Sequence, residues 1–147
     1  MKRVCVIDGQ GGGIGAALIK GLKDAYGESI ELTALGTNAI AAAQMLKAGA
    51  NRAASGENAI VRTAAAVDAI VGPVSICWAN AMLGEVTPRM AEAVTSSAAP
   101  KFLLPLAQES VTIVGTTAEP LPHLVQQLVQ KYITEVLGCV KPTRTSR

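Results

Sequence analysis

Strand-length apolar strings alternate with stretches of helical period along almost the whole chain, and this alternation restricts the fold more than any other feature. We expect strands at 3–8, 30–35, 52–54, 67–71, 101–104 and 111–114, and helices at 14–26, 38–47, 57–66, 76–83, from 87 onward and 121–137. Strand–helix–strand units of this length form parallel sheets through right-handed crossovers. The sequence therefore predicts an α/β fold, a Rossmann-like three-layer α/β/α arrangement with a mostly parallel open sheet of five to six strands.

The composition fits a single folded domain. Half of the 147 residues are apolar and 16% are charged, which is enough to build a buried core. We expect one domain over 1–140 and a polar, frayed tail over 141–147. No apolar run approaches the roughly 18 residues of a membrane span, and the apolar stretch at 4–7 is too short for a signal peptide. These observations predict a cytoplasmic protein that does not enter a membrane.

Charge and residue counts argue against two further classes of partner. There are 13 Lys and Arg against 11 Asp and Glu, and three of the positive residues lie in the last seven positions. The remaining body has no basic face for a nucleic-acid backbone, and its few aromatic residues form no stacking platform. Cys5, Cys77 and Cys139 lack C-x-x-C spacing, so we expect reduced, buried thiols. With His123 as the single histidine, we expect no metal site.

A glycine-rich loop follows the first expected strand and precedes the first expected helix. Residues 9–15 have the sequence Gly-Gln-Gly-Gly-Gly-Ile-Gly. Glycines at this junction permit a tight turn, close approach of a phosphate and close packing of the helix, and the helix N-terminus attracts anions. We therefore predict that Gly9, Gln10, Gly11, Gly12, Gly13, Ile14 and Gly15 bind a phosphate group. The alternative is that these glycines only make a tightly packed crossover.

Asp8 stands at the mouth of this loop, where its carboxylate has two possible roles. It can accept hydrogen bonds from the glycine amides and fix the loop, which is the interpretation we favour. It can instead hold a ribose hydroxyl, or a magnesium ion that bridges to phosphate.

The other expected strand ends carry small polar residues, and in an open α/β sheet these ends form the ligand crevice. We therefore add six candidate cofactor contacts, namely Gly36, Thr37, Asn38, Gly72, Pro73 and Ser75. Asp8, Glu57, Asn58 and Glu85 are further candidates. Each polar residue among them can also serve as a helix cap. The strings 36–40 (GTNAI) and 56–60 (GENAI) match at four of five places, which suggests the same glycine turn and Asn cap used twice.

The second expected strand ends without the carboxylate that holds the ribose of NAD in related domains. Thr37 and Asn38 stand there instead, and both can donate hydrogen bonds to a 2′-phosphate. NADP or NAD is therefore the cofactor we consider, with a lean towards NADP.

A set of motifs resembles a small family of uncharacterised bacterial proteins known as a domain of unknown function. They lie at 8–15 (DGQGGGIG), 36–38 (GTN), 46–51 (LKAGAN), 56–59 (GENA), 72–73 (GP) and 84–88 (GEVTP). The likeness spans nearly the whole chain except the tail, and it implies no activity. The glycine loop alone is similar to that of short-chain dehydrogenases, but Ile30 and Val136 stand four residues after Tyr26 and Tyr132, so their Tyr-x-x-x-Lys pair is absent.

We predict that the chain binds a phosphate-bearing small molecule, a nucleotide or NAD(P)-like dinucleotide, as a non-catalytic or regulatory module. A homo-oligomer is expected, since the alanine-rich helix at 39–48 can pack closely against a second copy. Two alternatives stay open. One is a small oxidoreductase or transferase whose active site is completed by a partner subunit, and the other is a structural subunit whose glycine loop only packs. No catalytic residue can be assigned.

Overall fold

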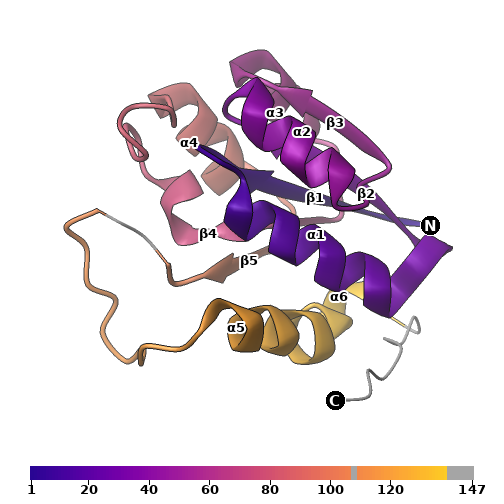
Figure 1. The fold of residues 1–147 in the computed structure, drawn as a ribbon. Coiled ribbons are helices and arrows are strands. Elements are labelled where there is room, and N and C mark those ends of the chain that lie inside the picture. Colours follow the sequence, from indigo (N-terminus) through magenta and orange to yellow (C-terminus); the bar gives the residue numbers. More distant parts are fainter. Residues whose placement is uncertain (107–108, 139–147) are drawn as a thin grey trace.

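The fold is a five-stranded parallel sheet between two layers of helices (Figure 1). The computed structural model describes residues 1–106 and 109–138, and the statements below refer to these residues. The strands are β1 (Lys2–Asp8), β2 (Ile30–Gly36), β3 (Arg52–Ser55), β4 (Ala69–Pro73) and β5 (Lys101–Leu104). Every pairing is parallel and the order is β3-β2-β1-β4-β5. This is the Rossmann order over five strands, which confirms the predicted fold class.

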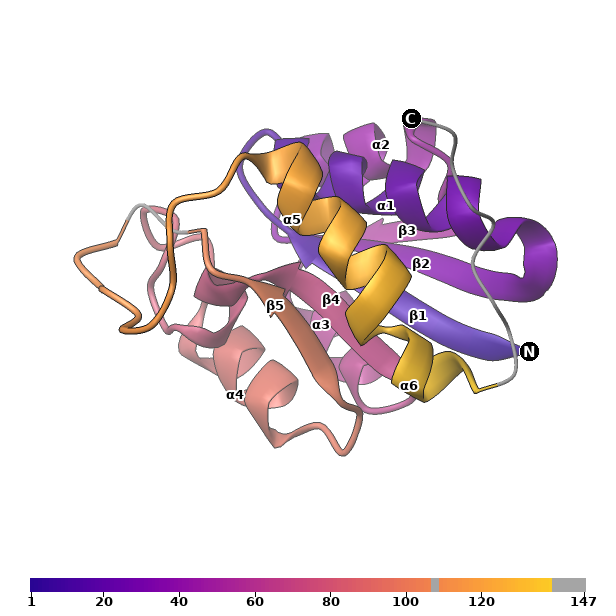
Figure 2. The ribbon, with the colours of Figure 1, turned by 90° about the horizontal axis from the view of Figure 1, so that it is seen from below.

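Helices on the two faces belong to different parts of the chain. One face carries α1 (Gly13–Tyr26), α2 (Ala39–Lys47), α5 (Leu121–Gln127), the π-helical segment η3 (Leu128–Tyr132) and α6 (Thr134–Leu137). The other face carries α3 (Glu57–Ala64), the 3-10 turn η2 (Val74–Cys77) and α4 (Pro88–Ser96). A further 3-10 turn, η1 (Gly27–Ser29), follows α1. Figure 2 shows α1 and α5 side by side on their face, with α4 on the opposite one.

The sheet divides the core into two apolar clusters, because the side chains of its central strands alternate between both faces. Val4 and Val6 of β1 pack with α1 and α5, whereas Cys5 and Ile7 pack with α3 and α4. All four side chains are buried. A strand covered on both faces is apolar at every position, which explains why the first string of the sequence has no polar alternation.

The expected helix at 76–83 is wrong. A 3-10 turn covers Val74–Cys77, and turns then continue to residue 86. Asn80, Met82 and Leu83 have φ values of 69°, 58° and 57°, and Gly84 has 90°. A right-handed helix cannot contain such residues, and the N–H of Asn80 bonds to the carbonyl of Val86 at 2.6 Å, which closes the segment on itself. We call residues 78–86 the Glu85 loop.

The expected strand at 111–114 is also wrong, so the described sheet has five strands. This segment turns locally, with the N–H of Val111 bonded to the carbonyl of Glu109 and that of Thr116 to the carbonyl of Ile113. Val114 is 94% exposed. Its β-branched residues suit a strand, but among the described residues no strand pairs with them.

The closing helix, expected as one element over 121–137, is interrupted in the middle. The N–H of Ile133 bonds to the carbonyl of Leu128, five residues earlier, which is the π-helical spacing. The carbonyl of Val129 instead accepts the hydroxyl of Tyr26 at 2.8 Å. The strand expected at 67–71 lies two residues further on, at β4. The expected tail at 141–147 and Cys139 lie outside the described residues.

The repeated motif has only one of the two predicted caps. The Asn38 side chain accepts the N–H of Ala41 at 2.8 Å and caps α2, as predicted. Asn58 caps nothing, because α3 begins one residue earlier, at Glu57, directly after Gly56. Gly56 has a φ of 99° and ends β3 with a turn so tight that the helix starts before the asparagine.

Candidate functional site

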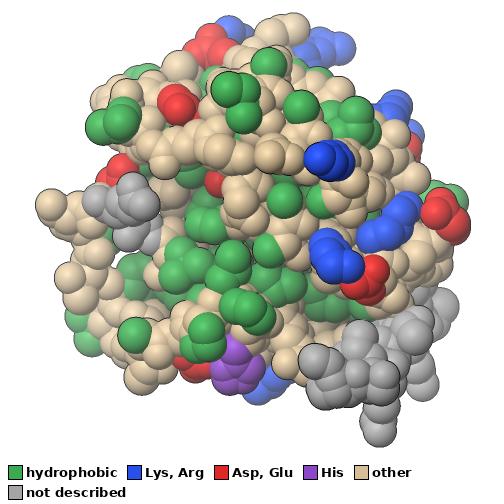
Figure 3. Space-filling view, in the orientation of Figure 1, with side chains coloured by type: hydrophobic (Ala, Val, Ile, Leu, Met, Phe, Trp, Pro, Cys, Tyr) green, Lys and Arg blue, Asp and Glu red, His purple; other side chains and the backbone are tan. Residues whose placement is uncertain are grey.

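A pocket of about 520 Å³ opens at the carboxyl ends of β1 and β4. It is lined by residues 8–14, by Pro73 and Ser75, and by Met82, Leu83, Leu106 and Glu109. The connections from β1 and β4 leave towards opposite faces of the sheet, so this is the switch point where open α/β sheets bind ligands. Figure 3 shows apolar side chains gathered between the segment after β5 and the body of the molecule.

Three of the five loop glycines are required by packing within the chain. A Cβ on Gly9 would collide with Thr37 and lie 2.6 Å from Sδ of Met82. One on Gly12, which has a φ of +76°, would lie 2.9 Å from Cα of Ala41. One on Gly15 would collide with Met45 and lie 2.8 Å from Cβ of Asp8. Gly12 and Gly15 thus let β1, α1 and α2 approach closely, and Gly9 lets the turn after β2 and the Glu85 loop lie against the end of β1.

Gly11 and Gly13 have no such reason to be glycine. A Cβ at either position would meet no atom within 4 Å, and neither φ is positive. Their N–H groups donate to none of the described residues. Both residues line the pocket, so they present bare peptide groups to it.

Asp8 fixes the loop from inside, as the favoured interpretation predicted. Its Oδ1 accepts the N–H of Gly9 at 2.8 Å and its Oδ2 that of Gly15 at 2.7 Å. The side chain is only 3% exposed. Burial raises the pKa of Asp8, an effect that the N–H bonds from Gly15 and Gly9 offset in part and the nearby charge of Glu85 reinforces. The carboxylate therefore takes the first-turn N–H of α1 that an external anion would otherwise use.

Glu85 reaches the loop from its outer side. Its Oε1 accepts the N–H of Gln10 at 2.8 Å, the hydroxyl of Thr37 at 2.7 Å and Nδ2 of Asn38 at 2.8 Å. Burial alone would raise the pKa of Glu85, but these three hydrogen bonds together outweigh it and lower the pKa. The Glu85 loop thus supplies a carboxylate at the end of β2, where the sequence of β2 itself has none.

The other predicted site residues divide between the pocket and the framework. Pro73 and Ser75 line the pocket, at the end of β4 and in η2. Gly72 does not line the pocket. A Cβ on Gly72 would collide with the carbonyl of Ile7, so glycine is required there for β4 to pack against β1. Gly36 is likewise enclosed by the start of α2. Thr37 and Asn38 lie beside the pocket, bonded to Glu85.

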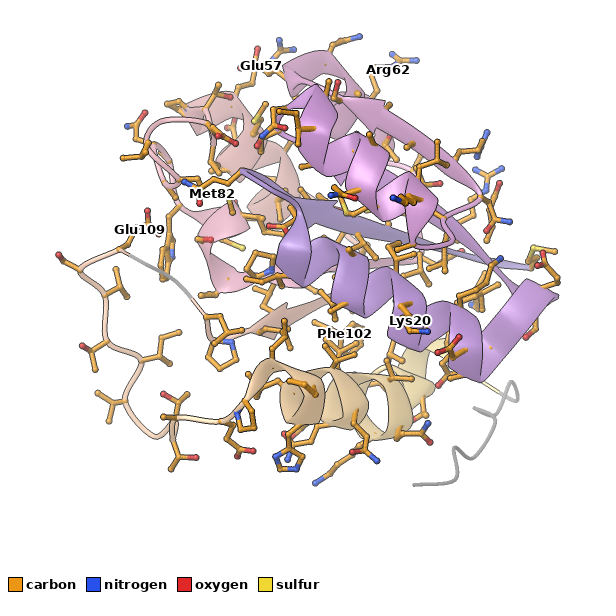
Figure 4. All side chains as sticks on the ribbon, in the orientation of Figure 1. Lys20, Glu57, Arg62, Met82, Phe102 and Glu109 are labelled. Atoms are coloured by element: carbon orange, nitrogen blue, oxygen red, sulfur yellow. The ribbon has the colours of Figure 1, made fainter. Side chains whose placement is uncertain are left out.

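Glu57 and Asn58 lie apart from this pocket. Oε2 of Glu57 accepts the hydroxyl of Thr87 at 2.7 Å, and Oε1 lies 3.7 Å from Arg89. Thr87 also caps α4. In Figure 4 Glu57 lies at the upper edge of the molecule, away from Met82 and Glu109. The Glu57 carboxylate therefore joins α3 to α4.

Four residues that line the pocket were not predicted from the sequence. Met82 and Leu83 lie in the segment where a helix is expected, while Leu106 and Glu109 follow β5. Oε1 of Glu109 accepts the N–H of Met82 at 3.0 Å, and Figure 4 shows these two residues on the same side of the molecule. Leu106 comes directly after the strand end at 104–105, a signal that could have placed it in the crevice.

No Lys or Arg is among the residues that line this pocket, whereas Asp8 and Glu109 are. A multiply charged anion would meet unfavourable charge here. Over the described ranges, no group of three His, Cys, Asp or Glu side chains is arranged to hold a metal ion. None of the described helices is both long and apolar enough to cross a bilayer.

The strand order and the glycine-rich loop at the switch-point pocket define a Rossmann-like α/β protein. The model of a family described as a domain of unknown function (DUF3842) matches residues 3–137, so the chain belongs to this family and the predicted resemblance is confirmed. No curated protein matches the chain significantly.

Among solved structures, the chain is similar to a dodecameric FMN-dependent UbiX-like decarboxylase from Escherichia coli O157:H7. The two share 13% sequence identity with a TM-score of 0.48, over 99% of this chain and 100% of the other.

Proposed function

We propose that this protein binds a phosphate-bearing mononucleotide in the switch-point pocket, as a binding or regulatory module. The observation that carries the proposal is the pair Gly11 and Gly13. Both are glycine without a packing or backbone requirement, both line an open pocket, and the N–H of neither donates to a described residue. Glycine at such positions costs chain entropy, and close approach of a phosphate to the backbone offsets that cost.

The size of the pocket fits this class of ligand. Small-molecule sites typically measure about 300–1,000 Å³, and this one measures about 520 Å³. Ile14, Pro73 and Leu106 offer apolar surface for a base. Because Asp8 and Glu109 also line the pocket, we infer that a single phosphate is accepted more readily than a pyrophosphate.

A dinucleotide fits less well, since the chain itself occupies the space over β1 and β2. Met82 and Glu85 lie against Gly9, and Glu85 is bonded to Thr37 and Asn38. The ribose of a bound NAD or NADP would lie at this strand end, so the Glu85 loop would have to move for it. The lean towards NADP stays a prediction, and the two donors on which it rests are engaged with Glu85.

The test is a binding panel with paired glycine variants. Wild-type protein is screened by thermal shift against AMP, ATP, FMN, FAD, NAD, NADP and sugar phosphates, and hits are measured by calorimetry. At 1 mM ligand, a Kd of about 0.1 mM stabilises the fold by about 1.4 kcal/mol. We expect a mononucleotide to bind more tightly than either dinucleotide, and Gly13→Ala to weaken its binding at least tenfold.

Gly11→Ala is the second variant, with the same expected loss of affinity. Neither added methyl group meets a protein atom, so both variants should fold as well as wild type. If both bind the mononucleotide with unchanged affinity, or if no phosphate compound binds wild type, the proposal is wrong. The alternative, in which the glycine-rich loop only packs against its neighbours, would then explain why the loop is rich in glycine.

A further inference from the structure

Three hydrogen-bond donors converge on one oxygen atom beside the pocket. They are the N–H of Gln10, the hydroxyl of Thr37 and the side-chain amide of Asn38, and the oxygen is Oε1 of Glu85. We propose that these donors form an anion site for the phosphate group of the ligand, and that the Glu85 carboxylate is an internal occupant which this phosphate displaces. The inference deepens the proposed function, because it concerns the phosphate of the same ligand.

The donor site is continuous with the pocket. Gln10 belongs to both, because it lines the pocket and donates its N–H to Glu85. The next residue, Gly11, offers an N–H that no described residue accepts. One phosphate carries three acceptor oxygens, so a group that contacts the N–H of Gly11 can take over that of Gln10 once Glu85 leaves.

The glycine at position 9 keeps the site compact. A Cβ there would collide with Oγ1 of Thr37 and lie 3.0 Å from Oε1 of Glu85. The donors and the carboxylate can therefore meet only over a bare backbone. This gives Gly9 a role in shaping the anion site in addition to its role in packing.

Displacement of Glu85 reduces the repulsion between a bound phosphate and the carboxylates at the pocket. A phosphate that entered with Glu85 in place would face three carboxylates, namely Asp8, Glu85 and Glu109. Glu85 is near enough to Asp8 for its charge to raise the pKa of that buried group. An exchange removes one carboxylate as the phosphate arrives, so the local negative charge rises less than it would if Glu85 stayed in place.

The Glu85 loop is held in a conformation that favours its release. Met82 and Leu83 have left-handed backbone angles that are costly for residues with such side chains, and the Leu83 side chain is 97% exposed. The described polar contacts from this loop to the rest of the chain include those of Glu85 and the bond between the Met82 N–H and Glu109. Relaxation of these backbone angles would offset part of the free energy that is lost when the hydrogen bonds of Glu85 break.

The experiment uses inorganic phosphate as the probe and NMR shifts of the Gln10 amide and the Asn38 side-chain amide as the readout. We expect Glu85→Ala to lower the Kd for phosphate at least tenfold, and Glu85→Gln to give a smaller gain, since its neutral amide still occupies the donors. Adding Thr37→Val to Glu85→Ala should abolish most of the gain.

Two matched controls separate displacement from a simple change of charge. Glu109→Gln removes a pocket carboxylate that none of the three donors touches, and Glu57→Gln removes a distant one. We expect less than a threefold change for Glu57→Gln. For Glu109→Gln we expect only the gain that comes from removing a pocket charge, which should be well below the gain for Glu85→Ala. A gain for Glu109→Gln equal to that for Glu85→Ala would overturn the proposal, as would no gain in either folded Glu85 variant.

A measurement on wild type covers the case in which both Glu85 variants fail to fold. Saturating phosphate should then shift the amide of Gln10 together with those of residues 82–84, because the loop is released. A shift at Gln10 without a change in the loop, or no shift at all, would overturn the proposal.

The outcomes also distinguish this inference from the proposed function. If Gly13→Ala abolishes nucleotide binding but Glu85→Ala gains no phosphate affinity, the proposed function stands and the displacement is wrong. If Glu85→Ala gains phosphate affinity while no nucleotide binds wild type, the anion site stands and the nucleotide proposal is wrong.

Discussion

The hydroxyl of Thr37 donates to Oε1 of Glu85 at 2.7 Å, across 48 positions of sequence. Thr37 belongs to the turn after β2, whereas Glu85 belongs to the loop between β4 and α4. Because β1 lies between β2 and β4 in the sheet, the contact spans the end of β1 and closes the glycine loop on its outer side. The stability of the loop and its access to ligands therefore depend on a carboxylate from a distant connection.

Thr37→Val should remove this contact and lower the free energy of unfolding by about 1–2 kcal/mol, since hydrogen bonds to charged groups contribute more than neutral ones. Urea denaturation measures the change. Thr33→Val, within β2 itself, is the matched control, because its hydroxyl bonds to none of the described residues. We expect the control to differ from wild type by less than half as much.

Glu85 should make the protein less stable in acid. The three hydrogen bonds that Glu85 accepts hold its folded pKa below the usual value of a glutamate. Its stabilising contribution is therefore present above the unfolded pKa of about 4.3 and is lost as the pH falls through the folded pKa. Denaturation of wild type and Glu85→Gln between pH 3 and 7 tests this. The difference in stability should be largest near pH 7 and shrink towards pH 3, and a constant difference would contradict the lowered pKa.

Asp8 should act in the opposite direction. Burial holds its folded pKa above the usual value of an aspartate, so the folded state holds the proton more tightly. The contribution of Asp8 is fully present below about pH 3.8 and is lost as the pH rises through the folded pKa. Relative to wild type, Asp8→Asn should therefore gain stability as the pH rises from 3 to 7, as measured by the same denaturation series. If Asp8→Asn instead loses stability relative to wild type as the pH rises, the N–H bonds from Gly9 and Gly15 outweigh the effect of burial on the pKa of Asp8.

Gly15→Ala and Gly13→Ala should have different effects on stability, although both lie in the first turn of α1. The methyl group at 15 would collide with Met45 and approach Asp8, and such overpacking costs about 1–3 kcal/mol. The methyl group at 13 meets open space, so that variant should match wild type or gain up to about 1 kcal/mol. Thermal denaturation of the two variants compares them directly.

The expected homo-oligomer can be tested on α2, whose outer face exposes Ile40 and Leu46. If a second copy packs there, the double variant Ile40→Glu and Leu46→Glu should reduce the mass measured by light scattering. Glu in place of Gln44, on the same helix, is the control. An unchanged mass in the double variant would place any interface elsewhere.

Local features were predictable from the sequence, while contacts between distant segments were not. Asn38 caps the helix that starts one residue later, so its role depends on three neighbouring positions. Glu85 binds Gln10 across 75 positions, and no local pattern indicates such a partner. Glu57 and Glu85 both follow a glycine in the motifs at 56–59 and 84–88, yet one bonds to Thr87 and the other to the glycine loop.

The two errors in the predicted secondary structure also come from contacts between distant segments, or from the lack of them. Residues 76–83 have a composition suited to a helix, but the Asn80 to Val86 closure and the Glu85 contacts hold them in turns. Residues 111–114 have the β-branched composition of a strand, but no described edge pairs with them. In both cases the tertiary structure overrides local propensity.

The bond from the Tyr26 hydroxyl to the carbonyl of Val129 joins residues 103 positions apart. During synthesis, Val129 is added to the chain long after α1 is complete, so Tyr26 has no partner for its hydroxyl until then. Contacts of such long range form late in folding. Until α5 and η3 arrive, the apolar side chains that they cover on β1, β4 and α1 stay in water. The order of synthesis thus leaves one face of the sheet unprotected longest, and aggregation during folding should begin at that face.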